Sequence, residues 1–136
     1  MTDINSAIAA AASGMRAQTV RMRIAAENVA NANSTGENPN EDPFRRRIPL
    51  LESTTLASGA VGVRVRGTNF DMSDFREEYN PGHPAADSNG YVHLPNVDTL
   101  VEMMDLREAT RAYEANLNMI EAARTMTNRA LDLLRR

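Results

Sequence analysis

The sequence contains no cysteine and no tryptophan, and only three phenylalanines and three tyrosines among 136 residues. Without cysteine the chain cannot form disulfide bonds, use a thiolate nucleophile or bind zinc through sulfur. No apolar run approaches the roughly 18–20 residues that cross a bilayer. The N-terminus also lacks the charged start and apolar stretch of a cleavable secretory signal. Such a protein would need another export route to work outside the cytoplasm.

Neither sign of charge predominates, since the formal net charge is only −3. Residues 1–35 carry a net charge of +1, residues 36–96 of −3 and residues 97–136 of −1, so both signs are mixed in every segment. No stretch is basic enough to follow a phosphate backbone. We therefore expect no nucleic-acid partner.

Residues 4–32 show the pattern of one long amphipathic helix. Mainly apolar residues recur every seven positions in two rows offset by four, which is the seam of a coiled coil. The first row is Ile4, Ala11, Gln18, Ala25 and Ala32, and the second is Ile8, Met15, Met22 and Val29. The segment from Asn31 to Gly36 ends the helix, because Asn and Gly tolerate the left-handed conformation and Asn and Ser side chains compete for backbone hydrogen bonds.

A second helix of almost forty residues follows Pro95, with Asn96 or Asp98 as its cap, and reaches nearly to Arg135. One sevenfold row is Leu106, Tyr113, Ile120, Thr127 and Leu134, and the other is Ala109, Asn116, Ala123 and Ala130. Before Leu106 the apolar phase changes, which indicates a different packing partner or a stutter.

Between the helices, residues 36–96 indicate a small β-rich insert. We expect an edge strand from Phe44 to Leu51, with Pro49 at a position that need not donate a hydrogen bond. Residues 60–66 alternate with period two and predict a half-buried strand, and Asn89-Gly90 predicts a tight turn. Phe70, Phe75 and Tyr79 are expected to line one small core.

The expected fold is α+β, with two long terminal helices forming a coiled-coil-like pair and a small β-rich insert between them. We divide the chain into an N-terminal assembly helix (1–35), the insert (36–96) and a C-terminal assembly helix (97–136). Alanine recurs along the seam, so an isolated helix pair buries little apolar area and should be marginally stable. This composition favours stabilisation by other chains.

No pattern of residues predicts a catalytic, cofactor or metal site. His83 and His93 lack partners at the spacing of a metal site. Asp87 to Gly90 lacks the closing Glu of a calcium loop, so a turn is the better interpretation. Arg45-Arg46-Arg47 lies in an expected strand, where alternate residues face opposite sides, so ion pairs at a solvated edge are favoured over an anion site.

Three stretches together resemble the axial proteins of the bacterial flagellum, the rod and hook family. The first is Ser13-Gly14-Met15-Arg16-Ala17-Gln18 followed by the Asn-rich helix end with Asn28, Asn31, Asn33 and Gly36. The second, Pro43-Phe44-Arg45-Arg46-Arg47, is similar to a motif of proximal rod proteins. The third contains Tyr79, Asn80, Pro81, His83, Pro84 and Asp87, then Gly90, Tyr91, Pro95 and Asn96. The resemblance extends over essentially the whole chain, including Ala109 to Asn116.

The resemblance implies a structural subunit of the proximal rod, without catalytic residues, cofactors or a small-molecule substrate. Such a subunit would transmit torque from rotor to hook and self-associate in a helical assembly. Its partners would be other rod subunits, the rod-to-membrane-ring adaptor and the flagellar type III export apparatus. It would lie in the basal body, in the rod spanning the periplasm, after export without a cleavable signal.

The seam residues are the candidate subunit interface. They are Ile4, Ile8, Ala11, Met15, Met22, Ala25, Val29, Leu106, Ala109, Tyr113, Ile120, Ala123, Ala130 and Leu134. Two other classes of protein stay open on the residues alone. One is a soluble coiled-coil adaptor that dimerises through the same helices. The other is an enzyme with a site in the insert.

Overall fold

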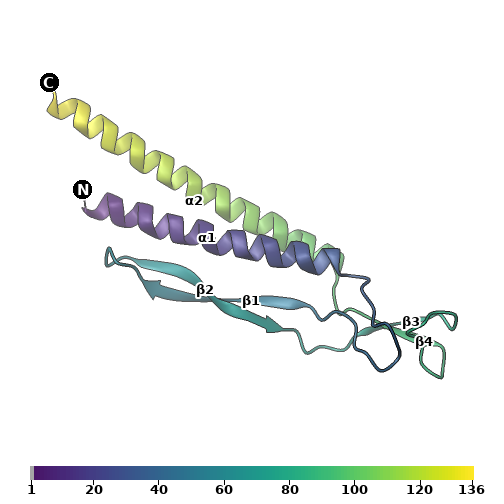
Figure 1. The fold of residues 1–136 in the computed structure, drawn as a ribbon. Helices are drawn as coiled ribbons and strands as arrows, with labels where there is room; N and C mark the ends of the chain where they lie inside the picture. Colours follow the sequence, from purple (N-terminus) through teal and green to yellow (C-terminus); the bar gives the residue numbers. More distant parts are fainter. Residues whose placement is uncertain (1) are drawn as a thin grey trace.

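The computed structural model describes residues 2–136 and confirms the α+β architecture of two terminal helices around a β-rich insert (Figure 1). In chain order the elements are α1 (Thr2–Ala30), β1 (Arg47–Thr55), β2 (Val61–Phe70), β3 (Arg76–Tyr79), β4 (Tyr91–Leu94) and α2 (Thr99–Leu134). Each element falls within one of the three expected segments. Within residues 2–136, no helix is both long and apolar enough to cross a membrane.

Helix α1 ends through side-chain hydrogen bonds. The amide Nδ2 of Asn31 donates to the carbonyl of Glu27 at 2.8 Å, and the Ser34 hydroxyl donates to Asn31 Oδ1 at 3.2 Å. The left-handed alternative is not used, because only Gly59 and Gly90 have positive φ among the described residues. The competition of Asn and Ser for backbone groups therefore decides where this helix stops.

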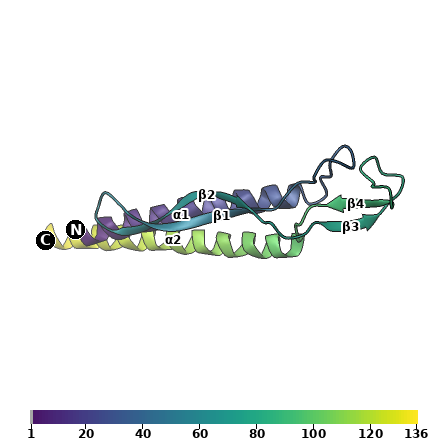
Figure 2. The ribbon, with the colours of Figure 1, turned by 90° about the horizontal axis from the view of Figure 1, so that it is seen from below.

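Helix α2 begins at the cap provided by Asp98, whose carboxylate accepts from the backbone N–H groups of Leu100 and Val101. With 36 residues it is about 54 Å long, whereas the 29 residues of α1 extend for about 43 Å. The two helices run antiparallel, and the C-terminal end of α2 extends past the start of α1 (Figures 1 and 2).

Strands β1 and β2 form an antiparallel hairpin that is longer than the sequence pattern predicts. Strand β1 begins three residues after Phe44 and continues to Thr55, because it pairs with β2 along its whole length. Arg66 is an unpaired bulge between the pairs Leu50–Gly67 and Leu51–Val65. Pro49 lies in this two-stranded sheet, where both strands are edges, as expected for a residue without an N–H donor.

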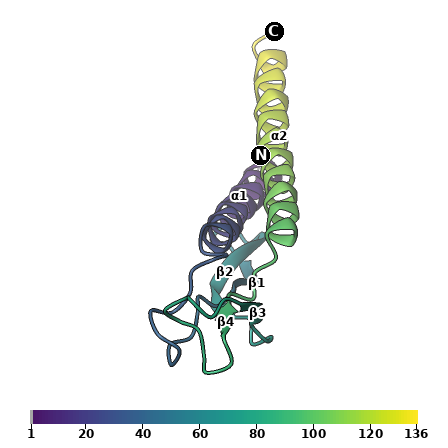
Figure 3. The same ribbon diagram turned by 90° about the vertical axis from the view of Figure 1, so that its right-hand side faces the viewer.

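Helix α1 lies between α2 and the β1–β2 hairpin, which contacts α1 but not α2 among the described elements (Figure 3). The residues that face the hairpin include Ser13, Ala17, Ile24 and Asn28, all buried. The Ser13 hydroxyl accepts from the backbone N–H of Val63 at 3.1 Å and donates to the carbonyl of Ala10 at 2.6 Å. Thus α1 has two buried faces, of which the sevenfold pattern indicated one.

Strands β3 and β4 form a second hairpin that extends beyond the ends of the helices (Figures 1 and 2). The expected small core of Phe70, Phe75 and Tyr79 is not formed. Phe70 and Tyr79 are exposed, and Phe75 lies under the guanidinium of Arg45 at 4.2 Å. Tyr79 instead packs edge-on against Tyr91, with ring centroids 5.3 Å apart. The aromatic residues are separated because they belong to two different hairpins.

Candidate assembly surface

The sevenfold rows of the two helices meet in one antiparallel seam. Ala11, Ala25, Ala109 and Ala123 are buried, and a second group is partly buried: Ile4, Ile8, Met15, Met22, Val29, Leu106, Tyr113 and Ile120. Ala130 and Leu134 are exposed, because they lie on the part of α2 that extends past α1. As contacts to another subunit, all these residues remain predictions.

Gly14 allows the helices to approach closely near the middle of the seam. A Cβ atom at Gly14 would lie 2.7 Å from the side-chain nitrogen of Asn116. A glycine inside a helix is less favourable than alanine by about 1 kcal/mol. The neighbouring Ser13 contacts β2, so the Ser13-Gly14 pair of the first motif contacts both partners of α1.

A second apolar line follows the outside of α2. It consists of Val101, Met104, Ala112, Ala115, Met119, Ala122, Met126, Ala130 and Leu133, which we name the outer stripe. From Ala112 onward its members are three or four residues apart, the spacing of one helix face. Met104, Met119, Met126 and Leu133 are 55–73% exposed. The single chain therefore leaves a long apolar face of α2 uncovered.

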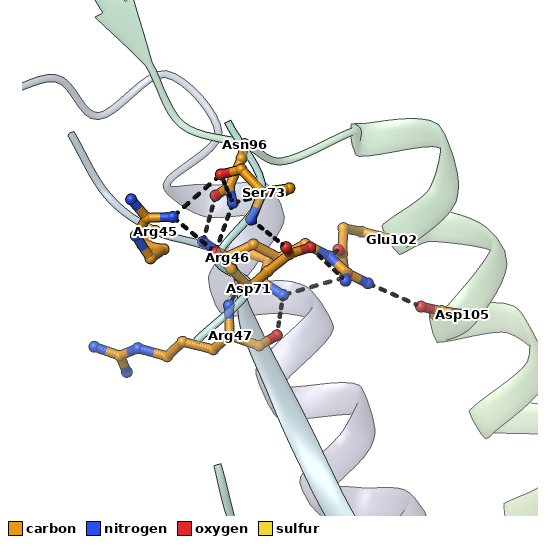
Figure 4. Close-up of polar contacts among 9 residues, drawn as sticks. Arg45, Arg46, Arg47, Asp71, Ser73, Asn96, Glu102 and Asp105 are labelled. Atoms are coloured by element: carbon orange, nitrogen blue, oxygen red, sulfur yellow. Dashed lines mark hydrogen bonds and ion pairs between the residues drawn. The ribbon is translucent and has the colours of Figure 1, made fainter. Parts of the chain in front are cut away.

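At the end of the helix pair next to the second hairpin, a polar junction joins α1 and α2 to the start of β1 and to the segments that precede β1 and follow β2 (Figure 4). Asn28, only 1% exposed, binds the backbone of Arg47 in both directions, accepting from its N–H at 3.0 Å and donating to its carbonyl at 2.9 Å. Its Nδ2 also donates to Glu102 Oε2 at 3.2 Å. The Asn28 side chain thus binds the backbone at the start of β1, as the backbone of a neighbouring strand would.

Arg46 is the cation at the centre of this junction. Its guanidinium pairs with Glu102, which is 2% exposed, with Asp71 at 3.4 Å and with Asp105 at 3.6 Å. Burial alone would lower the pKa of Arg46, but the hydrogen bonds and charges of Glu102 and Asp71 raise it above its usual value. The pKa of Asp71 is lowered, first by the backbone N–H of Ser73, then by the Ser73 side chain and by Arg46.

The three consecutive arginines take three different directions, whereas strand alternation predicts only two, because Arg47 alone belongs to β1. Arg45 donates to the carbonyl oxygens of Asp71 and Ser73, Arg46 reaches inward, and Arg47 pairs with Glu27 at 3.4 Å. The interpretation as ion pairs is therefore confirmed for Arg46 and Arg47, whereas Arg45 binds carbonyl oxygens instead. Arg46 is more enclosed than a solvated edge implies, because Glu102 lies beneath it.

Asn96 closes the junction from the side of α2. It accepts from the backbone N–H of Arg46 at 2.8 Å and donates to the carbonyl of Asp71 at 2.8 Å. The buried Pro95 provides a carbonyl that accepts from Arg76, which also donates to the carbonyl of Ala32 at 2.9 Å. Asn96 therefore ties the start of β1 to the segment after β2, while Asp98 caps the helix.

The residues of the third motif shape the loop between β3 and β4. The Asp87 carboxylate accepts from the N–H groups of Asn89 at 2.9 Å and Tyr91 at 3.0 Å. Gly90 has a φ of +85°, and a Cβ there would lie 2.8 Å from the Tyr79 ring, which confirms the turn predicted at Asn89-Gly90. His83 Nδ1 accepts from the backbone N–H of Ala85, so this side chain also stabilises a turn.

Other members of the motifs have simpler surroundings. Gly36 permits a tight loop, since a Cβ there would lie 2.5 Å from the carbonyl oxygen of Glu41. Asn33, Pro81 and Pro84 are exposed, and the N–H of Asn80 donates to the carbonyl of Gly90. Within residues 2–136 no group of His, Asp and Glu side chains is arranged to hold a metal ion.

Basic residues outnumber acids along the first hairpin and the segment before it, which carry Arg45, Arg46, Arg47, Arg64 and Arg66 with one acid, Glu52. The rest of the insert carries one base, Arg76, and the following acids: Glu37, Glu41, Asp42, Asp71, Asp74, Glu77, Glu78 and Asp87. The two groups meet at the junction, where Asp71 pairs with Arg46.

Comparison with known proteins identifies the family. The flagellar basal-body rod protein FlgC of Agrobacterium fabrum is 45% identical to this chain over 136 residues, which cover 99% of the chain and 98% of the relative. The chain belongs to the FlgC family of flagellar basal-body rod proteins. Its FlgC relative in Bacillus subtilis is 36% identical, with 90% of this chain and 92% of the relative covered. The FlgC protein of Borreliella burgdorferi is 35% identical, with 95% and 96% covered.

A family model agrees with this assignment over the C-terminal part of the chain. Residues 88–133 match the model described as flagellar basal body rod FlgEFG protein C-terminal. As a FlgC family member, the chain has a structural role in the rod of the flagellar basal body and associates with other components there. The expected resemblance to rod and hook proteins is confirmed, and its relatives are structural rod proteins rather than enzymes.

Three residues of the junction were not selected from the sequence. Glu102 occupies the seam position where the apolar phase changes, Arg46 was considered only as part of a basic run, and Asp71 follows β2 in an acidic stretch. The phase change before Leu106 was the available signal. It marks the point where a buried carboxylate replaces an apolar seam residue.

Proposed function

We propose that this FlgC family member assembles through its terminal helices, burying the outer stripe of α2 against helices of neighbouring subunits. The observation that carries the proposal is the exposed apolar line from Ala115 to Leu133, which contains Met119, Met126 and Leu133, with Met104 exposed nearer the start of the helix. Large exposed apolar patches mark interaction surfaces on soluble proteins. Methionine suits contacts with non-identical neighbours because its side chain adapts to irregular surfaces.

The test is a pair of adjacent substitutions on α2. Met119→Asp places a charge in the outer stripe, whereas Asn118→Asp places the same charge on an exposed polar position one residue away. A charge buried in a packed interface without a partner is strongly unfavourable. We expect Met119→Asp to abolish incorporation into purified basal bodies and Asn118→Asp to leave it unchanged. Equal incorporation of both variants would contradict assembly through this stripe.

In this proposal the assembled subunit belongs to the rod spanning the periplasm and transmits torque from the rotor to the hook. Its partners are other rod subunits and the adaptor that joins the rod to the membrane ring. Export proceeds without a cleavable signal through the flagellar type III apparatus, which recognises the N-terminal region. Family membership supports these assignments, because the relatives are basal-body rod proteins.

Co-purification tests the role of the first helix. The tagged full chain and a chain lacking residues 2–32 are each expressed in the cognate flagellated cell, and basal bodies are extracted with detergent. We expect the full chain in the basal bodies and loss of the truncated chain, with cytoplasmic and periplasmic fractions distinguishing failed export from failed assembly. Absence of the full chain, with motility retained by the tagged strain, would contradict the rod assignment.

The isolated monomer is expected to have frayed helix ends around a folded insert, because α2 is covered on one side only. The C-terminal end of α2 exposes Leu131, Leu133 and Leu134, and Leu134 is 84% exposed. Assembly would then order these segments by mass action. Hydrogen exchange on the dilute monomer measures this order, and strong protection along the whole of both helices would refute the expectation. A soluble coiled-coil adaptor, one of the two alternative classes, would instead form stable discrete dimers.

A further inference from the structure

Apart from the close approach of Gly14 to Asn116, the apolar rows of the α1–α2 seam do little to oppose sliding of one helix along the other. These rows repeat every seven residues, so a shift of α2 by one repeat, about 10 Å, brings the rows face to face again. Four of the buried seam residues are alanines: Ala11, Ala25, Ala109 and Ala123. Small side chains of one size pack similarly in each of these registers, so the apolar seam alone defines the register weakly.

The buried polar groups of the seam are specific to one register. Asn28 donates to Glu102, and Arg46 also pairs with Glu102. Asn28 and Arg46 belong to one side, because the backbone of Arg47 is bonded to Asn28 in both directions. Glu102 belongs to the other side, on α2. The three side chains therefore meet only when the helices are correctly aligned.

A shift by one repeat separates these groups without providing new partners for Asn28. In one direction Asn28 would face Ala109, and in the other it would face Pro95, which precedes α2. Neither residue has a side-chain acceptor. In the observed register, by contrast, no buried side-chain N or O atom within the described chain lacks a partner. Buried polar groups that lose partners are unfavourable, so the shifted registers, in which Arg46 and Glu102 lose each other and Asn28 keeps only its two bonds to Arg47, are penalised.

We propose that the Asn28–Glu102–Arg46 network sets the register of the two terminal helices. The apolar seam supplies attraction, and the network selects one alignment among the sevenfold alternatives, as single buried polar residues do in coiled coils. The inference concerns the single chain and stands independently of the proposed assembly function. Its test therefore uses the purified full-length protein without other flagellar components.

The chain has no cysteine, which permits a clean disulfide ladder. Met22 Sδ lies 3.4 Å from Thr110 Oγ1 in the observed register. Met22→Cys is combined in turn with Met103→Cys, Thr110→Cys or Leu117→Cys, which lie seven residues apart on α2. Cysteines whose Cα atoms are more than about 7 Å apart cannot bond without backbone movement. Each oxidised pair therefore reports one register, measured as the fraction of intramolecular disulfide.

With the native network we expect a disulfide almost exclusively at position 110. Replacing the network by Asn28→Leu, Arg46→Met and Glu102→Leu should reduce that fraction at least about threefold, with disulfide appearing at 103 or 117. The melting temperature should not fall, since apolar replacements of a whole buried ion pair are often neutral or stabilising. Glu108→Leu, a matched loss of one carboxylate outside the network, should leave the ladder unchanged. A ladder still confined to 110 in the triple variant would overturn the proposal.

A second variant keeps the test decisive if the triple variant does not fold. Glu102→Leu with Ala109→Glu moves the carboxylate by one repeat along α2. If the network sets the register, the main disulfide moves from position 110 to position 117. Folded protein with its disulfide still at 110 would overturn the proposal. A purely stabilising network would lower the melting temperature in these variants without redistributing the disulfides.

Discussion

Replacing Asn28 by alanine tests how much the polar junction contributes to stability. The side chain makes three hydrogen bonds, two with the Arg47 backbone at 2.9 and 3.0 Å and one with Glu102 at 3.2 Å. The substitution removes all three and leaves Glu102 buried with one partner fewer. The Arg47 backbone is nearer to solvent, so water can replace part of what is lost.

The expected loss follows from these contacts. Each neutral hydrogen bond contributes about 0.5–1.5 kcal/mol net, and a bond to a charged group about 1.5–3 kcal/mol. With partial rescue by water at Arg47, the free energy of unfolding should fall by about 3 kcal/mol. For a chain of this size that corresponds to a decrease of roughly 10 °C in melting temperature. Such a change is a large share of the 5–15 kcal/mol typical of folded domains.

The measurement is thermal and urea unfolding of the purified chain, followed by circular dichroism at 222 nm. Asn33→Ala is the control, because Asn33 is an exposed asparagine at the same end of α1 and its replacement should change stability by less than about 0.5 kcal/mol. Asn28→Asp should be more damaging than alanine near pH 7, since it places a second carboxylate beside Glu102. Equal melting temperatures for the Asn28→Ala and Asn33→Ala variants would refute the assigned role of Asn28.

Three further predictions concern the second hairpin, the acid side of the junction and the helix seam. Gly90→Ala should destabilise the chain more than Gly59→Ala in urea unfolding: both have positive φ, but a Cβ at Gly90 meets a tyrosine ring at 2.8 Å and one at Gly59 meets nothing within 4 Å. Folding lowers the pKa of Asp71, so its contribution to stability is present above the unfolded pKa of about 3.9 and disappears as pH falls through the folded value. The difference in the free energy of unfolding between the unchanged protein and the Asp71→Asn variant should therefore be constant near pH 6 and shrink below about pH 4. Met22→Asp or Ile120→Asp should block rod formation, scored by motility and basal-body purification, because a charge enters the partly buried seam; normal motility of either variant would count against the seam assignment.

The helices and their ends could be predicted from the sequence because their signals are local. The sevenfold rows place α1 and α2 correctly, Asp98 caps the second helix, and Asn31 ends the first through its side chain. The turn at Gly90 follows equally from the freedom of glycine at positive φ. Each of these features depends on residues within one or two turns of chain, so no knowledge of the fold is needed.

The junction could not be predicted because its parts are distant in the sequence. Glutamate usually lies on the exposed face of a helix, and the burial of Glu102 follows only once Arg46 and Asn28 lie against it. The assignment of Phe70 and Tyr79 to one core failed for a related reason. Period-two patterns identify strands but not which strands pair, and these two aromatics belong to different sheets.

The first hairpin is attached to α1 at two points. The helix therefore fixes the distance between these two points along the strands. Ser13 holds β2 at Val63 and Asn28 holds β1 at Arg47, whose partner on β2 is Phe70. Fifteen residues of helix extend for about 22 Å, and the six steps of β1 from Arg47 to Ser53, the partner of Val63, extend for about 20 Å, with the Arg66 bulge taking up the additional residue of β2. The two lengths agree within about 2 Å, so one residue added to β1 between these points would break one attachment or strain both. We expect inserted or deleted residues to be tolerated only in the turn after Thr55, which lies outside the part of the hairpin between the two attachments.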